Sequence, residues 1–116
     1  MIRLVRLYTG AYGQSRVSDE QVALGPDGSD RASPWEHAGE VRFQESPPGA
    51  RLGWHVAPRR QYVITLAGVL EFTTHDGAVF RIGPGDVLLA EDTTGGGHSW
   101  RTVGDDPWRR VYVSLD

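Results

Sequence analysis

Two histidines and a glutamine occupy positions from which their side chains could share one site. His55 and Gln61 would lie on the same face of an extended chain, because side chains alternate across a strand and these positions differ by an even number. His98 opens a later predicted strand. Imidazole nitrogens and carboxamide oxygens can both bind divalent metal ions. The sequence therefore predicts a site that holds a metal ion or orients a substrate.

Two adjacent carboxylates, Glu91 and Asp92, are candidates for acid–base catalysis. Glu91 ends a predicted strand and Asp92 follows it, and a carboxylate pair in a partly dry cleft can have one raised pKa. Either side chain could also supply the carboxylate that completes a metal site. The alternative is a solvated loop in which Asp92 caps a turn.

Three further side chains are candidates for binding a substrate. The Arg59 guanidinium could bind a carboxylate through two hydrogen bonds, unless Pro58 turns it outward. Trp54 and Trp100 could stack on a flat substrate, or they could be core aromatics. The three glycines at 95–97 have neither a following helix nor a lysine, so they are not a phosphate loop. We expect the segment 92–97 to be a mobile gate, because a loop at a barrel mouth has little packing.

Short segments of alternating apolar and polar residues, separated by turn sequences, must position these side chains. This pattern, without a convincing helix, is typical of a β-sandwich or barrel. Residues 8–38 are expected to be irregular apart from a short strand near Val22–Leu24. The other expected strands are 2–7, 40–44, 52–56, 61–67, 69–74, 78–82, 86–91, 98–103 and 108–115.

Composition excludes several classes of function. The chain of 116 residues fits one domain, and the absence of cysteine removes disulfides, thiolate metal sites and thiol nucleophiles. A net charge of −3 argues against a nucleic-acid partner. No apolar run is long enough to cross a membrane, and the opening residues do not form a signal peptide, so we expect a cytoplasmic protein. All basic residues are arginines, which excludes lysine Schiff-base chemistry.

The spacing of these residues resembles the cupin superfamily. The first cupin motif runs Gly, five residues, His-x-His, three or four residues, Glu, six residues, Gly, and Gly49, His55, Gln61 and Gly68 stand at this spacing. The second motif begins with Gly-Asp and ends with a histidine, as Gly85-Asp86 and His98 do here. The resemblance covers roughly residues 40–103.

The resemblance implies an all-β, antiparallel jelly-roll barrel with its site inside. One domain would then span 1–116, with an N-terminal strand and irregular segment at 1–38 and the motif-bearing core at 39–116. The expected function is a small-molecule enzyme of isomerase, cyclase, lyase or dioxygenase type. Its site would hold His55, Gln61, His98 and one divalent ion (Zn, Ni, Fe or Mn), with no organic cofactor.

Two departures from the family pattern favour an alternative. Ala57 stands where the second histidine of His-x-His would be, and Gln61 replaces the glutamate. These changes remove an imidazole and the charge that would compensate a divalent cation. The alternative is therefore a binding or sensor domain without a functional metal.

The strand at Gln61–Ala67 predicts a homodimer. The face opposite Gln61 carries Tyr62, Ile64 and Leu66, so both faces are largely apolar and both need cover. The barrel interior covers one face. A partner sheet or the N-terminal strand Ile2–Leu7 would cover the other.

Overall fold

The computed structural model describes residues 1–115, so residue 116, the last of the expected domain, lies outside the described residues. Strands dominate this part of the chain, and its one short 3-10 turn is not long and apolar enough to cross a membrane. The all-β class is confirmed. The elements are β1 (Arg3–Thr9), η1 (Ala11–Gly13), β2 (Ser15–Gln21), β3 (Gly25–Asp27), β4 (Asp30–Ala32), β5 (Val41–Ser46), β6 (Arg51–His55), β7 (Gln61–Ala67), β8 (Val69–Thr74), β9 (Val79–Ile82), β10 (Val87–Glu91), β11 (His98–Val103) and β12 (Trp108–Ser114).

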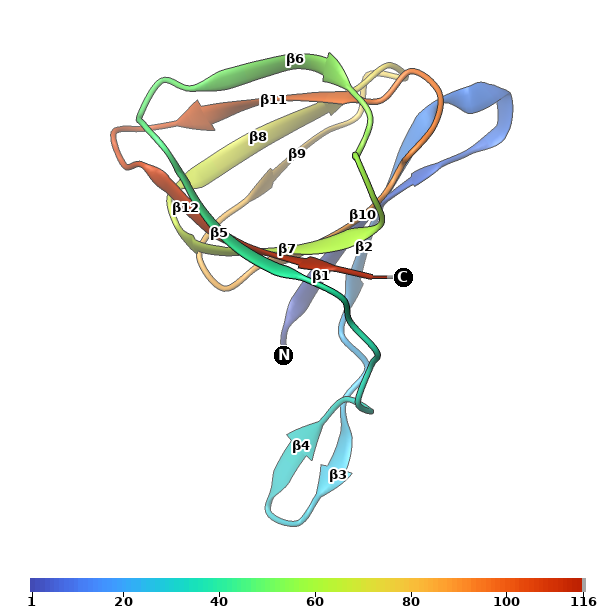
Figure 1. Cartoon of the computed structure of the whole chain (residues 1–116), viewed down its shortest axis with the longest axis vertical. Coiled ribbons are helices and arrows are strands. Elements are labelled where there is room, and N and C mark those ends of the chain that lie inside the picture. Colours follow the sequence, from blue (N-terminus) through green and yellow to red (C-terminus); the bar gives the residue numbers. More distant parts are fainter. Residues whose placement is uncertain (116) are drawn as a thin grey trace.

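Two sheets face each other and enclose the barrel interior (Figure 1). The larger sheet has the order β2-β1-β10-β7-β12-β5, and the smaller has the order β6-β11-β8-β9. Paired strands in the described chain are antiparallel, except that β1 is parallel to β10. The jelly-roll barrel is confirmed, and the N-terminal hairpin β1–β2 extends its larger sheet.

Alternation along the strands separates core from surface. In β7, Gln61, Val63 and Thr65 are buried, and in β8 the buried positions are every second residue from Leu70. This period of two is what a strand with one face toward a core requires. The hydrophobic core consists of Val5, Leu7, Val63, Leu70, Phe72, Ile82, Leu88 and Trp108.

The expectation for residues 8–38 was wrong. Val22–Leu24 is not a strand; instead β2 pairs along the whole of β1 and β3 forms a hairpin with β4. The sequence of β2 does not indicate a strand, because an edge strand needs little apolar alternation. Polar contacts help to hold it, including an ion pair of 2.9 Å between Arg3 and Asp19.

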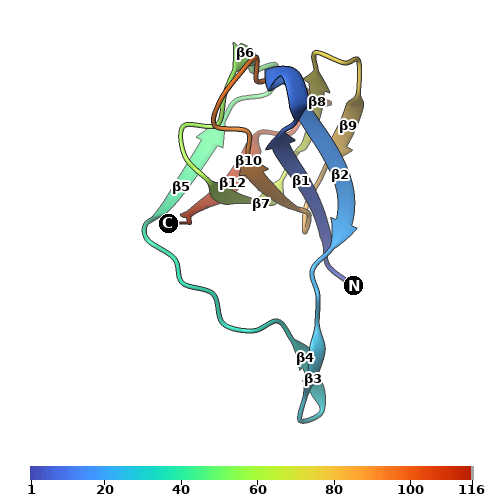
Figure 2. The same cartoon turned by 90° about the vertical axis from the view of Figure 1, so that its right-hand side faces the viewer.

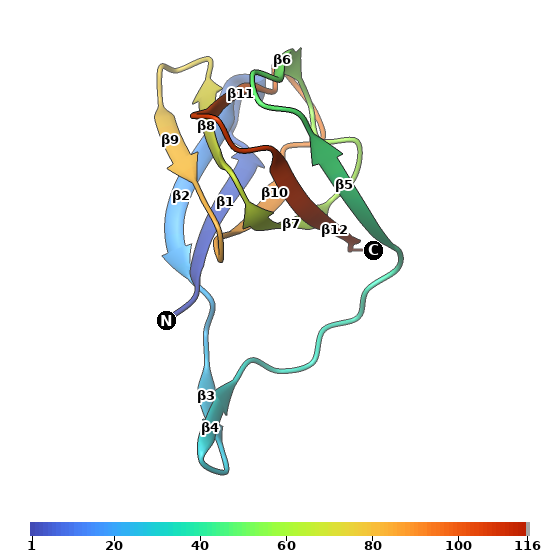
Figure 3. The ribbon, with the colours of Figure 1, turned by 90° about the vertical axis from the view of Figure 1, so that its left-hand side faces the viewer.

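The hairpin β3–β4 and the segment after it extend away from the barrel before the chain returns to β5 (Figures 2 and 3). Trp35 in this segment is completely exposed. The Tyr62 hydroxyl on β7 donates a hydrogen bond to Glu36 at 2.7 Å. Burial and this hydrogen bond raise the pKa of Tyr62 to about 12. The return segment is therefore attached to the outer face of the larger sheet.

Candidate functional site

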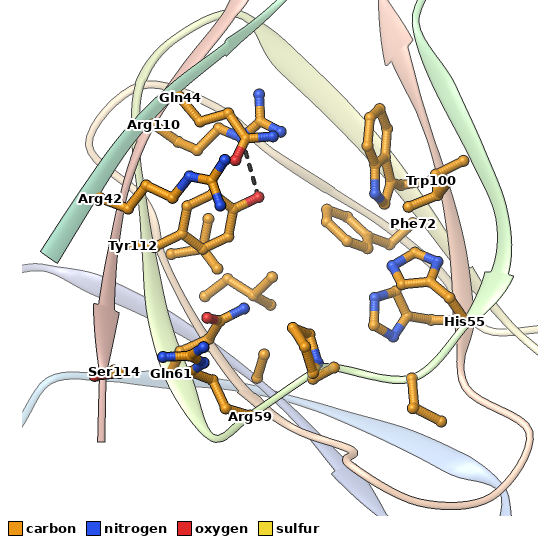
Figure 4. A pocket seen from close by; sticks show the side chains of 18 of the residues that line it. Arg42, Gln44, His55, Arg59, Gln61, Phe72, Trp100, Arg110, Tyr112 and Ser114 are labelled. Atoms are coloured by element: carbon orange, nitrogen blue, oxygen red, sulfur yellow. Dashed lines mark hydrogen bonds between the residues drawn. The ribbon is translucent and has the colours of Figure 1, made fainter. Parts of the chain in front are cut away.

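A cavity of about 680 Å³ lies between the two sheets. This volume is in the range of small-molecule sites. Figure 4 shows side chains that enter the cavity from two opposite walls. Those of the smaller sheet are His55, Phe72 and Trp100, and those of strands β5 and β12 are Arg42, Gln44, Arg110 and Tyr112.

His55 and His98 lie against each other in this cavity. They end β6 and begin β11, and these two antiparallel strands place them directly opposite one another. Their ring centroids are 4.5 Å apart and their planes meet at 61°. The structure thus brings together the two imidazoles that strand parity and motif spacing assigned to one site.

Asp92 supports His98 from the side away from the cavity. Oδ2 of Asp92 accepts hydrogen bonds from Nδ1 of His98 at 2.5 Å and from the Ser15 hydroxyl at 2.6 Å. Asp92 is fully buried and His98 is 4% exposed. Oδ1 of Asp92 is buried without a hydrogen-bond partner among the described residues. The solvated-loop alternative for Asp92 is therefore wrong.

His55 is held by its own strand. Its Nδ1 lies 2.7 Å from the carbonyl oxygen of Gly53. A carbonyl only accepts, so Nδ1 carries the hydrogen and Nε2 keeps its lone pair. Burial lowers the pKa of His55 below its ordinary value of 6.5, and the hydrogen bond to Gly53 only partly offsets this. His55 is therefore neutral at pH 7.

Other predicted residues divide between the cavity and the outside. Gln61, Arg59 and Trp100 line the cavity, and Gln61 and Arg59 lie on the side opposite His55 (Figure 4). Arg59 is ion-paired with Glu40 at 3.0 Å. Trp100 packs edge-on against Trp108, with 5.0 Å between ring centroids.

Trp54 and Glu91 do not line the cavity. Trp54 stacks on His75, with 3.7 Å between ring centroids. Glu91 accepts hydrogen bonds from Arg6 at 2.6 Å and Arg60 at 2.5 Å. Burial raises the pKa of Glu91, but these two hydrogen bonds outweigh it and leave the pKa below its usual range. An ionised, doubly bound carboxylate outside the cavity is poorly placed for acid–base catalysis there.

Five site residues were not predicted from the sequence. Ser15 lies in β2, which was not expected. Arg110 and Tyr112 line the cavity from β12, but the alternation of Val111 and Val113 in that strand favours the other face as the interior, so parity alone could not assign them. The pairing of Arg110 with Gln44 and of Tyr112 with Arg42 then extends this wall onto β5.

Comparisons with known proteins agree with this barrel. The model of the cupin domain family matches residues 42–114. The chain belongs to the cupin superfamily. No curated protein matches the sequence.

Three solved structures are similar to this chain. A conserved Klebsiella pneumoniae protein with a double-stranded β-helix domain is 23% identical, with a TM-score of 0.53 over 79% of this chain and 82% of that one. The cupin domain of Cnp3 from Schizosaccharomyces pombe is 14% identical, with a TM-score of 0.51 over 100% and 86%. The conserved SPY1581 protein of unknown function from Streptococcus pyogenes is 18% identical, with a TM-score of 0.47. The match covers 66% of this chain but only 62% of that protein. The likenesses to the first two structures concern the fold alone.

The donor set of this cupin does not fit a resident metal ion well. Among the described residues, no group of three or more His, Cys, Asp or Glu side chains could hold one. Ala57 is buried at the position of the missing imidazole, and Gln61 lies across the cavity from His55 (Figure 4). Metal sites of proteins commonly use at least three side-chain ligands. The assignment of His55, Gln61 and His98 as metal ligands stays a prediction, and we derive no chemical step from it.

Proposed function

We propose that this cupin is a small-molecule enzyme that transfers a proton within its barrel, with His98 as the base. The observation that carries the proposal is the buried hydrogen bond of 2.5 Å between Nδ1 of His98 and Asp92. It fixes the ring orientation and the tautomer, because an ionised carboxylate only accepts hydrogen bonds. Nε2 of His98 is then left with a lone pair, the form that a general base requires.

The Asp92 carboxylate also stabilises the product of the transfer. When Nε2 takes a proton from a C–H or O–H group, the electron pair stays on the substrate and His98 becomes an imidazolium. The positive charge then lies next to a carboxylate in a buried environment, where charge pairs interact more strongly than in water. Asp92 is thus a positioning residue, since His98 lies between it and the cavity.

His55 complements this base. Its lowered pKa keeps it neutral, and its free Nε2 can accept a hydrogen bond from a substrate hydroxyl. In the proposed reaction His98 takes the proton and His55 orients the substrate through this hydrogen bond. Of the expected reaction types, isomerases and lyases use such a transfer as their central step.

One observation favours a second candidate, a binding or sensor domain. Ala57 replaces a family imidazole and is 3% exposed, and its backbone N–H is held by the Asp92 carbonyl at 3.0 Å. A site that binds a ligand without converting it does not need that side chain. Such a domain would use the same cavity.

Hydrogen exchange would test the proposed function. The protein is incubated in D₂O with a library of small carbon acids and hydroxy compounds, and deuterium uptake into each compound is followed by NMR. We expect wild-type protein to catalyse exchange in at least one compound, and His98→Asn to lower that rate about 100-fold or more. His75→Asn, which changes an exposed histidine, is the matched control and should not alter the rate.

Two results would separate the candidates. Compounds that bind without exchange would favour the binding domain. An exchange rate unchanged in His98→Asn would show that the proposed base is wrong.

A further inference from the structure

Arg110 is a buried cation on the wall of the cavity opposite His55. It is 2% exposed, although arginine stays charged at any physiological pH and is seldom fully buried without a partner. Its hydrogen-bond partners among the described residues are neutral: Tyr112 at 3.1 Å from Nε, and Ser46 at 2.7 Å and the Trp108 carbonyl at 3.2 Å from Nη1. No carboxylate of the described chain pairs with it. Among the residues that the structure describes, the guanidinium therefore lacks a counter-ion.

The rings around Arg110 hold the guanidinium in place without neutralising it. Its central carbon lies 3.7 Å from the ring centroid of Trp108 and 5.5 Å from that of Tyr112. Cation–π contacts of this kind lower the cost of burial but leave the charge able to attract an anion. Among the described residues, nothing accepts a hydrogen bond from Nη2.

Arg42 adds a second cation to the same wall. It lies directly opposite Tyr112 in the pairing of β5 with β12, and Gln44 lies opposite Arg110. Figure 4 shows the side chains of Arg42, Gln44, Arg110 and Tyr112 gathered on this side of the cavity. Arg42 forms no ion pair with any residue that the structure describes. We call these four residues the arginine wall.

The charge of the cavity differs in sign from that of the whole molecule. Its lining has three guanidinium groups, from Arg42, Arg59 and Arg110, and one carboxylate, from Glu40. These four side chains give the lining a net positive charge, whereas the whole chain carries −3. A concave site lined by one sign of charge concentrates ligands of the opposite sign.

We propose that the arginine wall binds the carboxylate of a small organic acid whose apolar body lies along Phe72 and Trp100 toward His55 and His98. Guanidinium groups bind carboxylates with directed, charge-assisted hydrogen bonds, and aromatic side chains accept a flat apolar body. The inference deepens the proposed function, because it names the substrate class of the same cavity. It also rests on that proposal for the statement that the bound acid is a substrate.

Matched pairs of acids and amides would test the carboxylate preference. Benzoate, phenylacetate and 3-phenylpropionate are compared with their neutral amides by calorimetry and ligand-observed NMR at low salt. We expect at least one acid to bind about tenfold more tightly than its amide, the size of a hydrogen bond to a charged group. Arg42→Gln should remove about fivefold to tenfold of that preference and leave amide affinity unchanged.

The control variant is Arg109→Gln. Arg109 is the neighbour of Arg110 in β12, but it is exposed and paired with Glu45 at 2.7 Å on the outside. Arg109→Gln should therefore leave the affinity for acids unchanged. Arg110→Met is expected to remove the preference completely. Arg42 is exposed on an edge strand, so Arg42→Gln keeps the test decisive if Arg110→Met fails to fold.

The outcomes distinguish this inference from the proposed function. If no acid binds more tightly than its amide, including the case in which none binds, the inference is overturned. It is also overturned if Arg42→Gln and Arg109→Gln behave alike. A carboxylate preference without deuterium exchange would support the arginine wall and contradict the enzyme. Deuterium exchange into neutral compounds, without a preference for carboxylates, would support the enzyme and contradict the arginine wall.

Discussion

Nδ1 of His98 lies 2.5 Å from Oδ2 of Asp92, and neither side chain is open to bulk solvent. The two residues are close in the chain but are joined by a glycine-rich loop, so their contact depends on the path of that loop. The same Asp92 oxygen also accepts the hydroxyl of Ser15, from a strand at the other end of the sequence. This shared oxygen connects the N-terminal hairpin to the proposed base.

Replacement of Asp92 by asparagine keeps the shape of the side chain but removes its negative charge. An amide can donate as well as accept, so Asp92→Asn no longer fixes the tautomer of His98. We expect the deuterium-exchange rate to fall about 100-fold or more and the free energy of unfolding to fall by about 1–3 kcal/mol. Nitrogen-15 NMR of the His98 ring should show a change of tautomer.

Asp105→Asn is the control for this change, because Asp105 is an exposed loop residue. It should affect neither the rate nor the ring spectrum. A wild-type spectrum that persists in Asp92→Asn would mean that Asp92 does not orient the ring.

The lowered pKa of His55 predicts a loss of stability in mild acid. Burial, the largest cause, places the folded-state pKa below the unfolded value of 6.5. The unfolded chain therefore binds more protons below pH 6.5, so stability is full above this pH and declines as the pH falls toward the folded pKa. Urea unfolding at pH 7.5 and 5.5 would measure the loss.

His55→Asn should reduce the pH dependence in this window. His98 and Asp92 are the titratable groups that face His55. The same measurement in Asp92→Asn therefore identifies how much of the pH dependence comes from these two groups. Carboxylates with lowered pKa, such as Glu91, contribute only at more acidic pH. If the free energy of unfolding changes equally with pH in wild type and His55→Asn, the pH dependence does not come from His55.

The glycine loop before His98 is predicted to be intolerant of side chains. A Cβ at Gly97 would lie 2.0 Å from the carbonyl oxygen of His55, and its φ is +74°. Both a backbone clash and left-handed strain therefore oppose Gly97→Ala. We expect a loss of about 3 kcal/mol or more in unfolding free energy.

Gly104→Ala provides the matched control for strain alone. Its φ is +85°, but nothing lies within 4 Å of an added Cβ, so the loss should be about 1–2 kcal/mol. Equal losses in the two variants would show that the close contact at Gly97 is unimportant.

The expectation of a mobile gate was based on a wrong premise. A Cβ at Gly95 would lie 2.0 Å from the Gly13 carbonyl oxygen, and Gly96 donates a hydrogen bond of 2.9 Å to that same oxygen. The loop is packed against the N-terminal segment. This packing could not be predicted from the sequence, because a glycine run is typical of both flexible loops and close backbone contacts.

The barrel and the histidine pair could be predicted because they depend on local patterns. Strand parity and turn residues located the strands from β5 onward along the chain, and a fixed motif spacing assigned His55 and His98 to one site. The arginine wall could not be assigned in the same way, because it depends on which strand pairs with β12. The hydrogen bond from Ser15 to Asp92 was not predicted, because β2, which carries Ser15, lacks apolar alternation.

Of the two covers expected for the outer face of the larger sheet, a second copy of the chain remains as a prediction. The N-terminal strand was one of two expected covers, but β1 pairs beside β10 within the sheet and does not lie over β7. Phe43, Val111, Ile64 and Val87 stand opposite one another across four strands of this sheet. Phe43 is 75% exposed. An apolar row of this kind favours association with a second copy of the chain.

Sedimentation velocity at micromolar concentration would test this association. We expect a dimer for the wild type and a dissociation constant raised at least about tenfold in Phe43→Arg, because a charge would be buried at the interface. Val79→Glu is the control, since Val79 is 57% exposed on the other sheet and should leave the dimer intact. A wild-type monomer at these concentrations would contradict the prediction. Equal weakening by both variants would place the interface elsewhere.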